Sequence, residues 1–219
     1  MKIPYSSKMY EIISAITKKL SSIEFTKIIK VFKKKSYSLT TKQRNEIRGL
    51  VAKDYYIILT CTNSHLSTYL IKILSFIKTR KWPTYTHALM NVDNEVKIGR
   101  WKSFMFMEAT NAGVHWSSFN NVFNCDKVCL LKPKNLTIDE QTKVIDKMLT
   151  QHGKKYDNLF DLADESRLSC VELVRIALQA DPDYAKDFSE LEKQISKVGN
   201  LTPQMYRDCE DFEVVIEYK

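Results

Sequence analysis

The order of the apolar patterns along the chain most restricts its fold. Residues typical of strands occur in succession at 55–60, 86–92, 96–101, 103–109 and 127–132, and again at 212–218. Helical spacing of apolar residues occurs at 67–78, 139–151, 170–178 and 185–198. Because most strands follow one another instead of alternating with helices, we predict an α+β fold. Asp93-Asn94 predicts a hairpin turn between the second and third strands.

Positive charge is concentrated in the N-terminal quarter. Residues 1–53 hold 13 Lys/Arg and 3 Asp/Glu, a net charge of +10, whereas residues 54–219 hold 21 and 23, a net charge of −2. Apolar spacing predicts helices over 9–20 and 23–32, and Thr40 is typical of the start of a third. We therefore divide the chain into a basic helical extension, 1–52, and a folded domain, 53–219.

Basic amphipathic helices of this kind bind anionic membrane surfaces, acidic polymers or nucleic acid, and the same charges also occur on a merely solvated helix face. We expect a membrane surface or polymer as the partner of residues 1–53, with nucleic acid as a weaker alternative. A binding signal that falls steeply with salt would be expected for any of these partners.

Composition excludes several classes of protein. The chain is 44% hydrophobic and 27% charged, as in ordinary globular proteins. No run approaches the roughly 18–20 apolar residues that span a bilayer, and the N-terminus lacks the pattern of a secretory signal. With 5 glycines, the chain has no Gly-rich phosphate loop, and its odd count of 5 cysteines argues against a disulfide framework. We expect a cytoplasmic or virion-associated protein.

A cysteine stands where its thiol would be activated. Cys170 begins the predicted helix 170–178, and Ser166 and Ser169 precede it as candidate caps. The helix dipole and the first N–H groups of a helix favour the thiolate, which is the reactive form. A cysteine at a helix start is also a common small core residue, so this position alone does not establish chemistry.

An imidazole occurs on one predicted strand, and a carboxylate ends the next long predicted strand. His87 lies within the apolar strand 86–92, unlike His65, His115 and His152, and Glu108 ends the strand 103–109. A carboxylate bound to one ring nitrogen fixes the tautomer and leaves the other nitrogen to act as a base. Cys170, His87 and Glu108 therefore supply the residue types of a nucleophilic triad, with the Cys170 N–H as one oxyanion donor.

Five short segments follow one another in a distinctive order: Thr86-His87-Ala88-Leu89-Met90, Phe106-Met107-Glu108-Ala109, Tyr156-Asp157, Ser169-Cys170-Val171-Glu172-Leu173-Val174 and Leu201-Thr202-Pro203. In order and spacing they resemble the motifs of the permuted NlpC-like cysteine hydrolases, the YiiX-like branch of the papain-like superfamily. The resemblance covers residues 53–219. In this order His and Glu precede Cys, whereas ordinary papain-like enzymes place Cys first.

The resemblance implies Cys170 as nucleophile, His87 as base and Glu108 as the group that orients it. It implies a small antiparallel sheet packed on the Cys-bearing helix, and cleavage or transfer of an acyl group through a thioester. The substrates it implies are cell-wall peptides or the acyl groups of lipids. The lecithin retinol acyltransferase-like proteins are relatives with the same permuted order. The sequence departs from the family's motifs at two points. Lys53-Asp54 stands where the family has Gly-Asp, and Cys170-Val171-Glu172 stands where it has Cys-Ser-Glu.

Two other classes of function compete with the hydrolase. Cys61, His65, Cys125 and Cys129 could be imagined as zinc ligands, although their spacings are not those of familiar zinc sites. The core could also be a catalytically silent scaffold whose basic extension does the binding. We expect no cofactor and no metal.

Overall fold

The computed structural model describes residues 39–63, 66–98, 101–158 and 162–219. The helices expected over 9–20 and 23–32 lie outside them. Six strands form one sheet in the order β4-β3-β2-β1-β5-β6, and each neighbouring pair is antiparallel. The strands are β1 (Ile57–Cys61), β2 (His87–Ile98), β3 (Trp101–Thr110), β4 (Gly113–Ser118), β5 (Lys127–Pro133) and β6 (Phe212–Tyr218). The mixed α+β class is confirmed.

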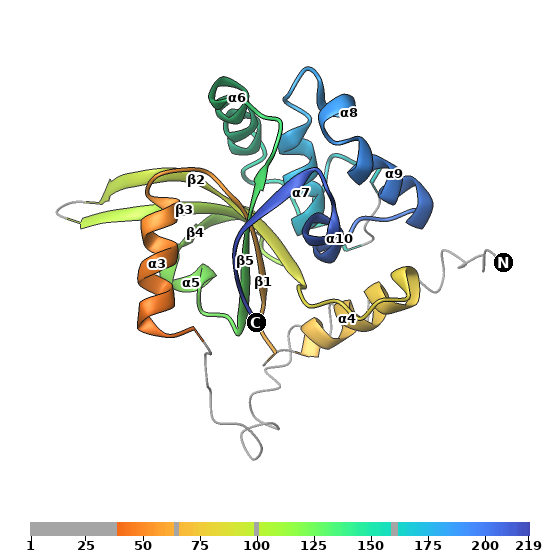
Figure 1. The fold of residues 1–219 in the computed structure, drawn as a ribbon, viewed down its shortest axis with the longest axis horizontal. Helices are drawn as coiled ribbons and strands as arrows, with labels where there is room; N and C mark the ends of the chain where they lie inside the picture. The colour runs from red at the N-terminus through yellow and green to blue at the C-terminus, as the bar shows by residue number, and fades with distance from the viewer. Residues whose placement is uncertain (1–38, 64–65, 99–100, 159–161) are drawn as a thin grey trace, which may run out of the picture.

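Helices cover both faces of the sheet, as Figure 1 shows. Ile57 and Leu59 of β1 face one core, and Ile58 between them faces the other, as period-2 alternation requires. The first core packs against α6 (Ile138–Leu149), α7 (Cys170–Leu178), α9 (Ser189–Val198) and α10 (Pro203–Asp208). The second packs against α3 (Thr41–Val51) and α5 (Phe119–Val122). The short α8 (Tyr184–Asp187) precedes α9, and α4 (Leu66–Thr79) joins β1 to β2.

Helix α3 belongs to the packed body of the molecule. Thr40 caps it with a capping box that includes Gln43. Its residues Ile47 and Val51 are fully buried in the second core, against the sheet. The division of the chain at residue 52 stays a prediction, but the helix before that point contributes to the core of the sheet domain.

The turn predicted at Asp93-Asn94 is wrong. Strand β2 continues through these residues to Ile98, and β3 begins at Trp101. The pairing of β2 with β3 shifts register between Asn91 and Asp93 and again between Asp93 and Val96. These turn-forming residues therefore mark an irregularity within a strand of a long hairpin. They do not mark the point where the chain reverses direction.

Other boundaries differ less. The helix predicted over 185–198 is divided at Phe188 into α8 and α9. The helix predicted over 139–151 is α6, which Thr137 and Glu140 start with a capping box. Among the described residues, no helix combines the length and the apolar character needed to cross a bilayer.

Candidate active site

The side chains of His87 and Glu108 meet across two neighbouring strands. His87 begins β2, and Glu108 lies on β3 opposite Leu89. The Nε2 atom of His87 lies 2.7 Å from Oε2 of Glu108. Because an ionised carboxylate only accepts hydrogen bonds, Nε2–H is the donor. Burial raises the pKa of Glu108, but the hydrogen bond and charge of His87 outweigh burial and hold that pKa below its usual value.

Helix α7 brings Cys170 to the same place. The helix packs against β2 and β3, and Cys170 is its first residue. Ser169 caps the helix: its hydroxyl accepts from the Glu172 N–H, and the Glu172 carboxylate accepts from the Ser169 N–H at 2.6 Å. Ser166, the other candidate cap, donates instead to Asp164. The local sequence thus fixes where the helix begins, and with it the position of the thiol.

The Cys170 side chain lies close enough to the His87 ring that its hydrogen-bonding capacity and charge raise the pKa of His87. Since Nε2 is held by Glu108, Nδ1 is the ring nitrogen left for the sulfur. Cys170 is 4% exposed as a residue, whereas the His87 side chain is 25% exposed, so the imidazole is the more accessible of the two. The structure therefore brings Cys170, His87 and Glu108 together in series, and it leaves their chemical roles to experiment.

The imidazole holds its proton unusually tightly. Burial lowers the pKa of His87, but the hydrogen bonds to Cys170 and Glu108 and the charges of both outweigh it and raise that pKa to about 10. His87 is then protonated at neutral pH, between two groups that carry or can carry negative charge.

Removing the thiol should change this titration. NMR of the His87 ring is expected to give a midpoint near pH 10, far above the ordinary value of about 6.5. In Cys170→Ala the hydrogen bond and the charge of the sulfur are lost, so the midpoint should fall. A midpoint near 6.5 in both proteins would show that the sulfur and imidazole do not interact.

Three other cysteines have thiols whose pKa is raised. Cys125, Cys129 and Cys209 are buried, and burial is the main cause that raises the pKa of each thiol to about 12. These thiols are protonated at neutral pH. Since the thiolate is the nucleophile, they should react slowly with alkylating agents.

Strand β4 adds two polar contacts to Glu108 that the sequence analysis missed. His115 pairs with Glu108 in register, and its Nε2 lies 3.6 Å from Oε1 of Glu108. The hydroxyl of Ser117 is hydrogen-bonded to the same carboxylate and helps to lower its pKa. The alternation of 113–118 after Asn111-Ala112 is the signal that could have identified this strand.

The segment before α7 is tied to the sheet by backbone hydrogen bonds. The Val114 N–H donates to the Lys154 carbonyl at 2.8 Å, and the Leu168 N–H donates to the Lys155 carbonyl at 2.9 Å. Gly113 permits this approach, because it has φ +94° and a Cβ there would lie 2.5 Å from the Lys154 oxygen. The next residue, Tyr156, has a pKa far above its usual value, raised first by burial and then by the charge of Cys170.

The structure describes the backbone N–H of Cys170, the first candidate oxyanion donor, but it does not identify a second donor. Cys170 supplies the first N–H of α7, and the first N–H groups of a helix have no acceptor within the helix. The loop 62–65, which follows β1, is a candidate for the second donor. In that loop the Asn63 N–H donates to Asp126 at 2.6 Å, and Ser64 and His65 lie outside the described residues.

The zinc alternative does not assemble. Cys129 lies in the first core, and Cys125 lies in the second core, on the other face of the sheet. His65 falls outside the described residues. Within the described ranges, no group of three or more His, Cys, Asp or Glu side chains is arranged to hold a metal ion.

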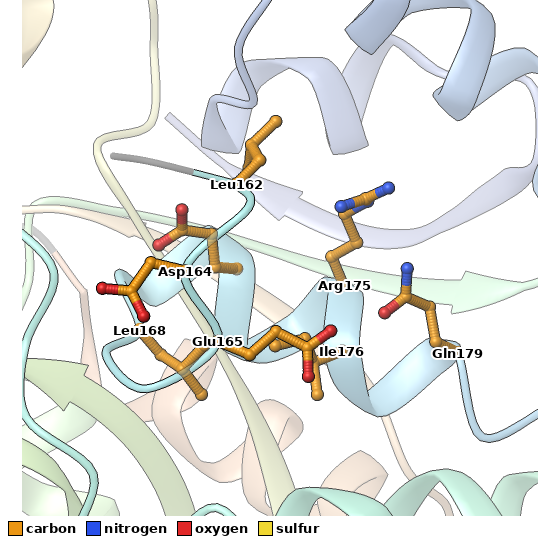
Figure 2. Close-up of a pocket in the computed structure, with 8 residues that line it drawn as sticks. Leu162, Asp164, Glu165, Leu168, Arg175, Ile176 and Gln179 are labelled. Carbon is orange, nitrogen blue, oxygen red and sulfur yellow. The ribbon is translucent and has the colours of Figure 1, made fainter. Parts of the chain in front are cut away.

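Figure 2 shows a pocket beside α7. It is lined by Leu162, Asp164, Glu165 and Leu168 of the preceding loop, by Glu172, Arg175 and Ile176 of α7, and by Gln179, which caps the C-terminal end of α7. At 100° per residue, these four helix positions lie on the side of α7 opposite Cys170. Arg175 is also held by Glu192, at 2.9 and 3.1 Å. The pocket therefore does not belong to the candidate active site.

Comparison with known proteins defines the fold and not the family. No family model matches the chain, and no curated protein matches it by sequence. Among solved structures, it is similar to the metalloprotein yiiX of Escherichia coli O157:H7, with a TM-score of 0.51 and 18% sequence identity. The match covers 74% of this chain and 96% of that one.

The chain has a YiiX-like fold, and at this identity the likeness concerns the fold alone. The other protein is described as a metalloprotein. The described residues of this chain offer no cluster that fits a metal ion, so we derive no chemistry through a metal.

Proposed function

We propose that this chain is a cysteine hydrolase or acyltransferase that works through a thioester on Cys170. The observation that carries the proposal is the series of contacts from the Cys170 thiol to His87 and from His87 to Glu108 at 2.7 Å. The YiiX-like fold and the order His, Glu, Cys support a permuted papain-like, NlpC-like relationship. The fold alone would not imply activity, because one fold serves many functions.

The chemistry follows from the protonation state of the pair. The Cys170 thiolate attacks the carbonyl carbon of an acyl group, and a carbon–sulfur bond forms as the carbonyl oxygen gains negative charge beside the Cys170 N–H. His87 donates its proton to the leaving nitrogen or oxygen, whose bond to the carbonyl carbon breaks. Water then attacks the carbonyl carbon as His87 accepts its proton, so a carbon–oxygen bond forms. The carbon–sulfur bond breaks, the Cys170 thiolate is restored, and a carboxylic acid is released.

The same intermediate also serves acyl transfer. If an alcohol or amine replaces water, the acyl group passes to that acceptor, and His87 accepts the proton that the acceptor loses. We propose cell-wall peptides or lipid acyl groups as substrates. These two differ in the leaving group and in the acyl chain that would remain on the sulfur.

Mass spectrometry tests this function. The protein is incubated with cell-wall peptide fragments and, separately, with phospholipid, quenched in acid, and digested. We expect the mass of an acyl group on the Cys170 peptide, and an ester at the same residue in a slower Cys170→Ser variant. No adduct and no product with either class of substrate would favour the alternative of a silent scaffold with a binding extension.

Glu108→Gln is expected to slow turnover without abolishing it. The amide can still accept a hydrogen bond from His87, but it lacks the charge that helps to raise the pKa of His87. We expect a loss of roughly 10- to 100-fold, smaller than that of His87→Ala. Steady-state rates on one substrate measure it, and equal losses in the two variants would show that the carboxylate does more than orient the ring.

A further inference from the structure

Exposed apolar side chains gather on helix α4 and just after it. Tyr69, Ile73 and Phe76 are 39%, 45% and 41% exposed, and Trp82 is 57% exposed. The first three recur at i, i+4 and i+7, so they follow one side of the helix. The Trp82 ring lies 6.0 Å from the Phe76 ring. These four residues form one surface, which we name the α4 stripe.

Among the described side chains of helix α4, three polar ones are buried, which is unusual for a surface helix. Thr68, Lys72 and Ser75 are 6%, 6% and 4% exposed. The Thr68 hydroxyl donates to the Thr62 carbonyl at 2.7 Å, and the Lys72 ammonium donates to Asn63 at 2.8 Å. In Figure 1, α4 stands apart from the group of α7, α8, α9 and α10. The polar contacts thus hold the helix with its apolar stripe outward, which is the signature of an interaction surface.

The charge around the stripe identifies the partner. Residues 66–86 include four Lys or Arg and no Asp or Glu. Arg80 and Lys81 are exposed next to Trp82. Aromatic and aliphatic side chains flanked by cations are typical of helices that lie in the interface of an anionic membrane. We propose that the α4 stripe docks on the surface of an anionic phospholipid bilayer.

Two other occupants fit less well. Residues 1–38 include nine Lys and two Glu, so their charge has the same sign as that of residues 66–86 and opposes pairing. A single-stranded nucleic acid would match the charge and could stack on the aromatic rings, but it offers no apolar phase for Ile73. A bilayer accommodates the charge, the aromatic rings and the aliphatic side chain together.

Vesicle binding by the full-length protein tests the proposal. We expect the protein to sediment with vesicles of phosphatidylcholine and phosphatidylserine, more weakly with phosphatidylcholine alone, and less as salt rises. Ile73→Ser should weaken binding roughly tenfold, because it removes an apolar side chain from the interface. The matched control is Ile138→Ser, since Ile138 is 81% exposed on α6, away from the stripe, and it should bind like wild type.

Quenching by brominated lipid gives a second readout. Tryptophan fluorescence should be quenched by brominated phosphatidylserine vesicles, and Trp82→Phe should lose most of that quenching. Absence of binding, equal affinities for Ile73→Ser and wild type, or displacement of the vesicles by a single-stranded oligonucleotide would each overturn the proposal. Cys170→Ala should bind like wild type, so the result is independent of the proposed chemistry.

Discussion

Cys170→Ala is expected to abolish turnover of every acyl substrate while the protein stays folded. Without sulfur no thioester can form, and the loss should exceed roughly 10³-fold. Cys170 is buried, but its side chain is small, so the substitution should cost about 1 kcal/mol of unfolding free energy. In a domain of this size that lowers the melting temperature by about 2–4 °C.

Cys209→Ala is the matched control for this variant. Cys209 is another buried thiol of the same core, and its pKa of about 12 keeps it protonated. It should lose a similar amount of stability and keep full activity. If Cys170→Ala unfolds at room temperature, or if it retains the rate of Cys209→Ala, the thiol has a packing role and is not the nucleophile.

His87→Ala is expected to reduce turnover nearly as far as Cys170→Ala. The substitution removes the base that takes the thiol proton and the acid that protonates the leaving group. It also leaves the Glu108 carboxylate, 14% exposed, without its partner at 2.7 Å. Wild type should stay active on the alkaline side until the His87 proton is lost near pH 10, because the pKa of His87 is raised and the protonated ring is the acid.

His152→Ala provides the control for His87→Ala. His152 is exposed and contacts the Trp116 ring at a centroid distance of 5.9 Å. Its loss should leave both the rate and the pH profile unchanged. An alkaline limb near pH 6.5 in the wild type would contradict the raised pKa of His87, and equal rates for the two variants would remove His87 from the mechanism.

Local sequence predicted the parts of the site that depend on local physics. Cys170 starts a helix because Ser169 and Glu172 form a capping box, a pattern that spans only four residues. His87 and Glu108 were assigned to strands because β-branched and aromatic residues surround them. Their direct pairing follows from the single long hairpin of β2 and β3, whereas the sequence predicted a separate short strand, 96–101, between them.

The contacts that were missed depend on pairing between strands. Whether His115 faces Glu108 is decided by the register of β3 and β4, which a period-2 pattern does not specify. Asp93-Asn94 has the composition of a turn, and only the continued pairing of β2 with β3 shows that the chain goes straight on. The burial of Lys72 on α4, against the usual preference of lysine, is likewise set by its bond to Asn63.

The most direct test is the alkylation rate of each thiol at pH 6 to 7, measured on native protein with iodoacetamide and peptide mass spectrometry. We predict that Cys170 is modified much faster than Cys61, Cys125, Cys129 and Cys209, and that His87→Ala removes this difference. If all five thiols react at the same rate in the wild type, Cys170 is not activated by His87, and the proposed nucleophile is wrong.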